Sequence, residues 1–148
     1  MYLIQVSHDT WDEIIIQFSR NPIELFSLKP RKFEELIAEL LFREGFDIKL
    51  TPETRDGGRD ILAFNKSSIG KHLYLVECKK YSPQIPVGVS LVRALYGCVE
   101  QERATAGMIV TTSYFSKDAL DFREPLKYRL NLKDYEELVR WLNARTAL

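Results

Sequence analysis

Two adjacent strands are predicted by residues 59–81, RDILAFNKSSIGKHLYLVECKKY. One strand begins with an acid, Asp60, and the other ends with an acid and a base two positions apart, Glu77 and Lys79. Alternate residues of a strand share a face, so we expect Glu77 and Lys79 to point the same way and Cys78 the opposite way. The residues just before Glu77 are almost wholly apolar, which is typical of a strand covered on both faces. Charges are costly to bury there unless they pair or bind a metal.

Length and composition limit the class of protein. The 148 residues, 45% hydrophobic and 28% charged, predict one globular domain with a substantial core. Lys plus Arg and Asp plus Glu both number 21, and this zero net charge argues against binding of polyanions through bulk charge. The two cysteines form no C-x-x-C motif, which favours a reducing compartment. Because no signal peptide or membrane-length apolar run is present, we expect a soluble cytoplasmic protein that contacts no membrane.

The rest of the chain predicts an α/β domain. We expect helices at about 23–28, 31–44, 87–103, 116–122 and 132–145, and strands at 46–52, 60–65, 72–79, 106–112 and 128–130. The first twenty residues fit either a helix or a strand and stay unassigned. A helix between the third and fourth strands indicates a right-handed crossover into a parallel position. This order predicts a mixed central sheet flanked by helices on both faces.

The helix expected at 31–44 has an apolar stripe and glutamates of two kinds. Glu34 borders the stripe, so we expect its carboxylate to reach the interior. Glu35 and Glu39 lie on the opposite side and are expected to be solvated. His8 and His72 have no partner at a functional spacing, and no role is assigned to either.

The acids and the lysine together point to metal chemistry. Neighbouring strands lie about 4.8 Å apart, so Asp60 and Glu77 can share one divalent ion. Hard oxygen ligands suit Mg²⁺, or Mn²⁺, better than zinc. Lys79 would place a fixed positive charge beside the ion, where it can stabilise a developing phosphorane charge or orient a water. Each residue alone is more simply explained by an exposed ion pair or a turn, but the combination with Glu34 favours metal-assisted phosphodiester hydrolysis.

Four stretches, in this order, resemble the Mrr-like branch of the PD-(D/E)xK nuclease superfamily, which has the restriction-endonuclease-like fold. They are FEELIAELLFREGF at 33–46, DGGRDI at 56–61, LVECKKY at 75–81 and IVTTSYFSKDA at 109–119. The resemblance implies an αβββαβ core, a DNA substrate and dependence on Mg²⁺ with no small-molecule cofactor. It implies catalytic roles for Asp60, Glu77, Lys79 and Glu34, and metal ligation by the three acids and the backbone carbonyl of Cys78.

One nuclease domain is expected over residues 1–148, with an N-terminal extension at 1–30, a catalytic core at 31–122 and a C-terminal strand and helix at 123–148. DNA contacts are expected from a basic rim and from hydroxyls after the fourth strand, namely Arg55, Arg59, Lys80, Thr112, Ser113 and Lys117. Solvated charges and helix capping explain the same residues equally well.

The assembly and two other functions follow from the same core. Because cleavage of both DNA strands needs two sites, we expect a homodimer. The core also fits a structure-selective nuclease such as a junction resolvase, or a non-catalytic nuclease-fold module that binds DNA or a protein.

Overall fold

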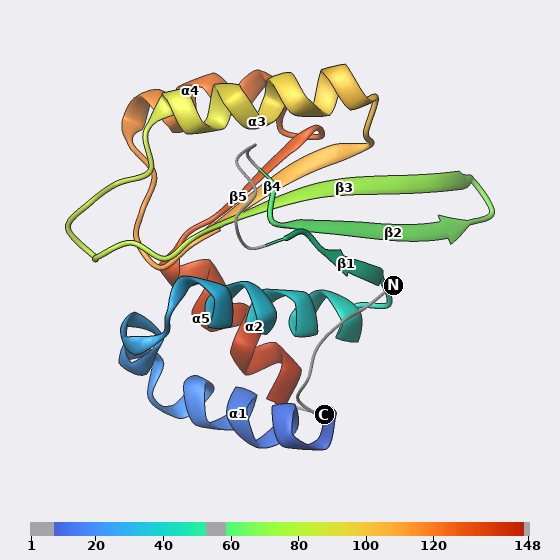
Figure 1. Cartoon of the computed structure of the whole chain (residues 1–148). Coiled ribbons are helices and arrows are strands. Elements are labelled where there is room, and N and C mark those ends of the chain that lie inside the picture. Colours follow the sequence, from blue (N-terminus) through green and yellow to red (C-terminus); the bar gives the residue numbers. More distant parts are fainter. Residues whose placement is uncertain (1–7, 53–58, 147–148) are drawn as a thin grey trace.

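A five-stranded mixed sheet separates two layers of helices in the computed structural model, which describes residues 8–52 and 59–146 (Figure 1). The strands, in spatial order, are β1 (Asp47–Leu50), β2 (Ile61–Ser67), β3 (Gly70–Lys79), β4 (Ala106–Thr111) and β5 (Leu130–Lys133). Helices α1 (His8–Arg20), α2 (Pro30–Arg43) and α5 (Tyr135–Thr146) lie on one side of the sheet, and α3 (Val89–Glu102) and α4 (Lys117–Arg123) cover the other. Two short 3-10 helices are η1 (Pro22–Ser27) and η2 (Glu124–Leu126).

The sheet topology agrees with the sequence expectation. Strands β1, β2 and β3 form an antiparallel meander, whereas β3 pairs in parallel with β4 across the α3 crossover, and β4 in parallel with β5. The mixed sheet with helices on both faces is therefore confirmed. None of the described helices is long and apolar enough to span a membrane.

Some element boundaries differ from the prediction. Residues 8–20 form α1, which the sequence left unassigned. The polar turn expected at 66–71 is largely strand, because β2 and β3 stay paired as far as Ser67 and Gly70. The last strand lies later than expected, at Leu130–Lys133, since alternate residues of it are buried. The final helix accordingly begins later, after Asp134, whose Oδ1 accepts a 3.0 Å hydrogen bond from the Glu137 amide.

Helix α3 lies unusually close to β4. A Cβ added to Gly107 would stand 2.9 Å from Val99 Cγ2 and 3.0 Å from Leu95 Cγ. Both side chains are fully buried, so the space for them to move is small. Gly107 therefore allows the close packing of the crossover helix on the sheet.

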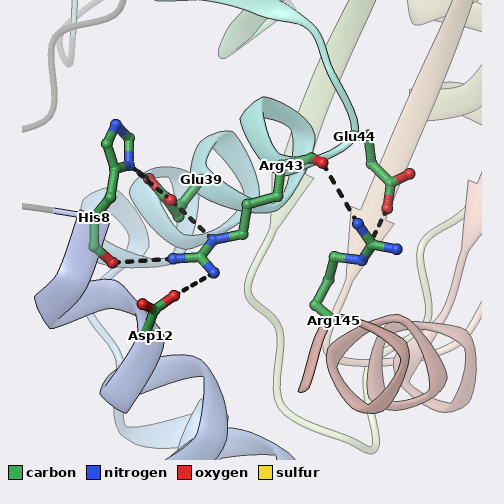
Figure 2. Close-up of polar contacts among 6 residues, drawn as sticks. All are labelled: His8, Asp12, Glu39, Arg43, Glu44 and Arg145. Atoms are coloured by element: carbon green, nitrogen blue, oxygen red, sulfur yellow. Dashed lines mark hydrogen bonds and ion pairs between the residues drawn. The ribbon is translucent and has the colours of Figure 1, made fainter. Parts of the chain in front are cut away.

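Glu39 on α2 is fully buried, which contradicts the expectation that it is solvated. Its Oε2 accepts a 2.9 Å hydrogen bond from Arg43 Nε and lies 2.9 Å from His8 Nδ1 (Figure 2). Arg43 also donates to Asp12 and to the backbone carbonyl of His8. The reason is that α1 covers the side of α2 that faces away from the sheet (Figure 1).

The C-terminal helix joins the same network. Arg145 on α5 donates to the backbone carbonyl of Arg43 at 3.4 Å and pairs with Glu44 at 3.4 Å (Figure 2). Trp141 Nε1 donates to the same Glu44 carboxylate at 3.0 Å. The C-terminal half of α2 is thus held by polar contacts to both α1 and α5.

Gly107→Ala tests the close approach of α3 to β4. We expect it to lower the free energy of unfolding by about 1–3 kcal/mol, because the added methyl overpacks the core against Val99 and Leu95. Gly97→Ala is the matched control, since Gly97 is exposed on α3 and its new Cβ would meet nothing within 4 Å. That control should gain about 0.5–1 kcal/mol from helix propensity. Urea unfolding measures both changes, and a loss of stability in both variants would contradict the packing argument.

Glu39→Gln tests the buried network while keeping the shape of the side chain. We expect a loss of about 1–3 kcal/mol in urea unfolding, because the partly buried Arg43 loses its charged partner. Glu35→Gln is the control, since Glu35 pairs with Lys32 at 3.1 Å and the Lys32 side chain is 56% exposed. Pairs of that kind contribute at most about 1 kcal/mol. Equal losses in the two variants would refute the structural role of Glu39.

Candidate active site

Asp60 is held against the end of β3, at the point where β2 begins. Its backbone amide donates a 2.7 Å hydrogen bond to the Val76 carbonyl, and its Oδ2 accepts a 2.7 Å hydrogen bond from the Cys78 amide. Cys78 stands between Glu77 and Lys79 in the strand, so the Asp60 carboxylate lies beside the backbone that carries both. The structure therefore brings the first predicted acid to the predicted E-x-K motif.

Glu77 and Lys79 form an ion pair on the α3 side of the sheet. Lys79 Nζ lies 3.0 Å from Glu77 Oε2, and the Glu77 side chain is only 4% exposed while that of Lys79 is 28% exposed. Leu75, two residues earlier, packs in the apolar core under α3. Cys78 lies in the core on the α2 side, so the expected opposite orientation of Cys78 is confirmed.

Burial controls the charge states of these groups. It raises the pKa of Asp60, against the Cys78 hydrogen bond and the positive charges of Lys79 and Arg31. It also raises the pKa of Glu77, against the attraction of Lys79, and the Asp60 charge adds to that rise. Burial alone would lower the pKa of Lys79, but the Glu77 carboxylate more than offsets this and raises it. Lys79 therefore stays protonated at neutral pH. Asp60 and Glu77 need a nearby cation to be ionised, because burial disfavours their charged forms.

Glu34 reaches the same region from α2 but is engaged by an arginine. Its Oε1 accepts a 2.9 Å hydrogen bond from Arg31 Nη1, which also donates to the Thr51 carbonyl at 2.8 Å. The Arg31 charge lowers the pKa of Asp60, as noted above. Sequence reasoning missed Arg31, although its position three residues before Glu34 on one helix is a spacing at which side chains meet.

A divalent ion at this site would depend on the carboxylates of Asp60 and Glu77. Within residues 8–52 and 59–146, no three His, Cys, Asp or Glu side chains gather into a metal-binding group. Mg²⁺ is commonly held by one or two protein carboxylates, with water and substrate phosphate completing its shell. Asp60 and Glu77 are two carboxylates of this kind, and the charge of Asp60 raises the pKa of Glu77. The two-carboxylate set fits Mg²⁺, whereas the expected three-acid cluster is not formed.

The hydroxyls after β4 support the end of β3. Thr112 Oγ1 donates to the Tyr81 carbonyl at 2.6 Å, and the Ser113 hydroxyl donates to the Ile85 carbonyl. Thr111 Oγ1, at the end of β4, donates to the Lys79 carbonyl at 2.7 Å. A hydroxyl has one proton to donate, so these three groups are committed within the protein.

The basic residues of the expected rim are dispersed. Lys80 Nζ donates to the Phe26 carbonyl at 2.9 Å, and Arg59 pairs with Glu102. Lys117 is 87% exposed and pairs with Asp121 at 2.8 Å. Arg55 lies outside the described residues. Of the rim's basic residues in the described part, Arg59 and Lys80 are partly buried and Lys117 is exposed.

Known proteins share both the sequence and the fold of this chain. Residues 25–142 match the family model Mrr_cat, described as restriction endonuclease. The type IV methyl-directed restriction enzyme EcoKMrr of Escherichia coli is 31% identical over 121 residues, which cover 78% of this chain and 38% of that protein. An uncharacterized protein of Sinorhizobium fredii is 28% identical over 122 residues, which cover 82% of this chain and 31% of that protein. The chain thus spans about a third of the length of these curated relatives.

Two solved structures share the fold. The DNA modification-dependent restriction endonuclease AspBHI has a TM-score of 0.66 at 23% identity, over 98% of this chain and 39% of that one. The MspJI restriction endonuclease in complex with a 27-mer oligonucleotide has a TM-score of 0.57 at 19% identity, over 99% and 38%. The resemblance found in the sequence is confirmed by the family match over most of its length. The chain belongs to the Mrr_cat family of restriction endonucleases.

Proposed function

We propose that the chain is a Mg²⁺-dependent DNA endonuclease that hydrolyses phosphodiester bonds. The observation that carries this proposal is the Asp60 carboxylate, bonded at 2.7 Å to the Cys78 amide between the paired Glu77 and Lys79. Family membership supports a nuclease, and a fold neighbour solved with an oligonucleotide supports DNA as the substrate.

In this proposal each residue has a separate task. Asp60 and Glu77 hold Mg²⁺, the backbone carbonyl of Cys78 is a further ligand, and Glu34 assists. The bound ion supplies Lewis-acid polarisation of the phosphate and a lowered pKa for water. Because the Glu77 carboxylate raises the pKa of Lys79, Lys79 acts as a fixed positive charge that orients water and offsets negative charge at phosphorus. Thr111 keeps Lys79 in place through its 2.7 Å bond to the Lys79 carbonyl.

The assembly and location are proposals of the same kind. Cutting both strands of a duplex needs two sites, so a homodimer is the working assembly. Lys117, exposed beyond the end of β4, is the described rim residue best placed to meet phosphate. A cytoplasmic location is consistent with the reduced, buried Cys78 thiol.

The proposed cleavage is tested with supercoiled, linear, nicked and four-way-junction DNA in Mg²⁺ or in EDTA. Wild type should cut at least one form in Mg²⁺ only. Asp60→Asn and Lys79→Ala should each lose roughly 10²-fold or more in rate, the scale seen when a charge-stabilising group is removed. Lys66→Ala, at an exposed position near the end of β2 that lies away from Asp60, should stay within a few fold of wild type. Wild type inert on all four forms, or site variants that cut like wild type, would overturn the proposal, and preference for junctions would indicate a structure-selective nuclease.

The raised pKa of Asp60 predicts a stability change of opposite sign to the activity change. A carboxyl whose pKa is higher in the folded than in the unfolded state contributes its full stabilisation only below the unfolded-state pKa. This stabilisation is lost as the pH rises through the folded-state pKa, because the buried carboxyl then ionises. Without metal at neutral pH, Asp60→Asn, which can still accept from Cys78, should therefore melt higher than wild type. This difference should disappear below the ordinary pKa of aspartate.

Mg²⁺ should reverse the order of the two proteins. A ligand that binds the folded state at about 100 times its dissociation constant stabilises it by about 2.7 kcal/mol. Mg²⁺ should thus raise the melting temperature of wild type but leave Asp60→Asn nearly unchanged. Asp121→Asn, at an exposed acid, is the control and should respond to Mg²⁺ as wild type does. Equal Mg²⁺ shifts in all three proteins would exclude Asp60 as a ligand.

A further inference from the structure

Arg31 lies between the helix acid and the strand that leads to Asp60. Its Nη1 donates at 2.9 Å to Glu34 Oε1 and at 2.8 Å to the backbone carbonyl of Thr51. Thr51 in turn donates from its amide to the Asp60 carbonyl at 2.9 Å. The guanidinium thus connects the first turn of α2 to the backbone that positions Asp60.

Three acids approach one point of the sheet without forming a joint site. Asp60, Glu34 and Glu77 each lie close enough to Cys78 for their charges to act on its thiol. Among the described residues they nevertheless form no three-acid metal-binding group, and Glu34 is paired with Arg31 instead. The position of Glu34 is therefore set by a cation that the chain itself supplies.

We infer that Arg31 is a positioning residue whose guanidinium pairs with Glu34 and holds that carboxylate away from Asp60 and Glu77. Once a divalent ion is bound, Glu34 pairs with the ion in place of Arg31. The inference rests on the proposed function, because it assumes that Asp60 and Glu77 bind the ion. A divalent ion carries twice the charge of a guanidinium, so the flexible Glu34 side chain prefers it once it is bound. Arg31 keeps its second bond, to the Thr51 carbonyl, and so stays in place when Glu34 moves.

A neighbouring ion pair shows what an ordinary surface contact looks like. Lys32 and Glu35 have the same three-residue spacing on α2, at 3.1 Å, with the Lys32 side chain 56% exposed. Arg31 and Glu34 are 27% and 15% exposed, and only Arg31 of the two cations also bonds to the end of β1. The charge of Arg31 also acts on Asp60. These differences separate Arg31 from a helix-stabilising pair.

Calorimetric titration with Mn²⁺, in the absence of DNA, tests the inference. Arg31→Met removes the charge and keeps much of the volume, so it should bind Mn²⁺ about two- to fivefold more tightly, the factor that corresponds to one partly exposed ion pair. Glu34→Gln should bind more weakly than wild type, and Arg31→Met should give no gain in the Glu34→Gln background. Lys32→Met removes a charge from the same helix turn and should leave the affinity unchanged. A merely structural role for Arg31 would not produce a gain that requires Glu34.

The outcomes separate this inference from the proposed function. Wild type that binds Mn²⁺ and cuts DNA, with Arg31→Met binding equally or more weakly, would overturn the inference alone. Wild type that neither binds Mn²⁺ nor cuts would overturn both. If Arg31→Met shows no folding transition in a melting assay, the Mn²⁺ affinity of Glu34→Gln tests the inference. An unchanged affinity of that variant would exclude Glu34 as the carboxylate that Arg31 holds away from the ion. Arg31→Lys, which keeps the charge, should bind Mn²⁺ like wild type, and a gain equal to that of Arg31→Met would also refute the role of the charge.

Discussion

The hydrogen bond from the Cys78 amide to the Asp60 carboxylate marks the point where the pairing of β2 with β3 ends and the candidate site begins. Up to Ile61 and Val76 the hairpin is a regular antiparallel ladder, and beyond it a side chain replaces the backbone acceptor. The neighbouring strands secure both partners of this bond. Thr51, after β1, bonds to the carbonyls of Arg59 and Asp60, and Thr111 of β4 bonds to the carbonyl of Lys79. The acid is thus fixed by backbone on both sides, which limits the rearrangement needed when charge develops.

The sequence could predict features that depend on neighbours along the chain. The placement of Glu77 and Lys79 on one face follows from the two-residue repeat of a strand, and the parallel position of β4 follows from the intervening helix. The helix expected to begin at residue 116 starts there, since the Ser116 hydroxyl caps α4 by accepting a hydrogen bond from the Ala119 amide at 3.1 Å. Each of these features is decided within a few residues or by the rules of strand connection.

The features that the sequence did not predict depend on distant partners or on backbone atoms. Glu39 looked solvated because a helical wheel of α2 shows the face toward the sheet but not α1, whose His8 lies 31 residues earlier. Arg31 was missed because one of its two acceptors, the Thr51 carbonyl, is a backbone atom that every residue possesses. The hydroxyls of Thr112 and Ser113 were read as phosphate contacts for the same reason, since their acceptors are also carbonyls. Side-chain patterns cannot reveal such acceptors.

Helix α2 connects the stability of the fold to the geometry of the site. Its C-terminal half is fixed by the buried Glu39 and by Arg43, while its first turns present Arg31 and Glu34 beside Asp60. A helix that is fixed at one end moves mainly as a rigid body. The network of α2 with α1 and α5 therefore also sets the position of the helix turn that carries Glu34. The charged side chains of α2 therefore hold the helix in place at one end and lie beside the candidate site at the other. Helix α1, which precedes α2 in the chain, consequently helps to position the candidate site, because its His8 and Asp12 complete the network that fixes α2.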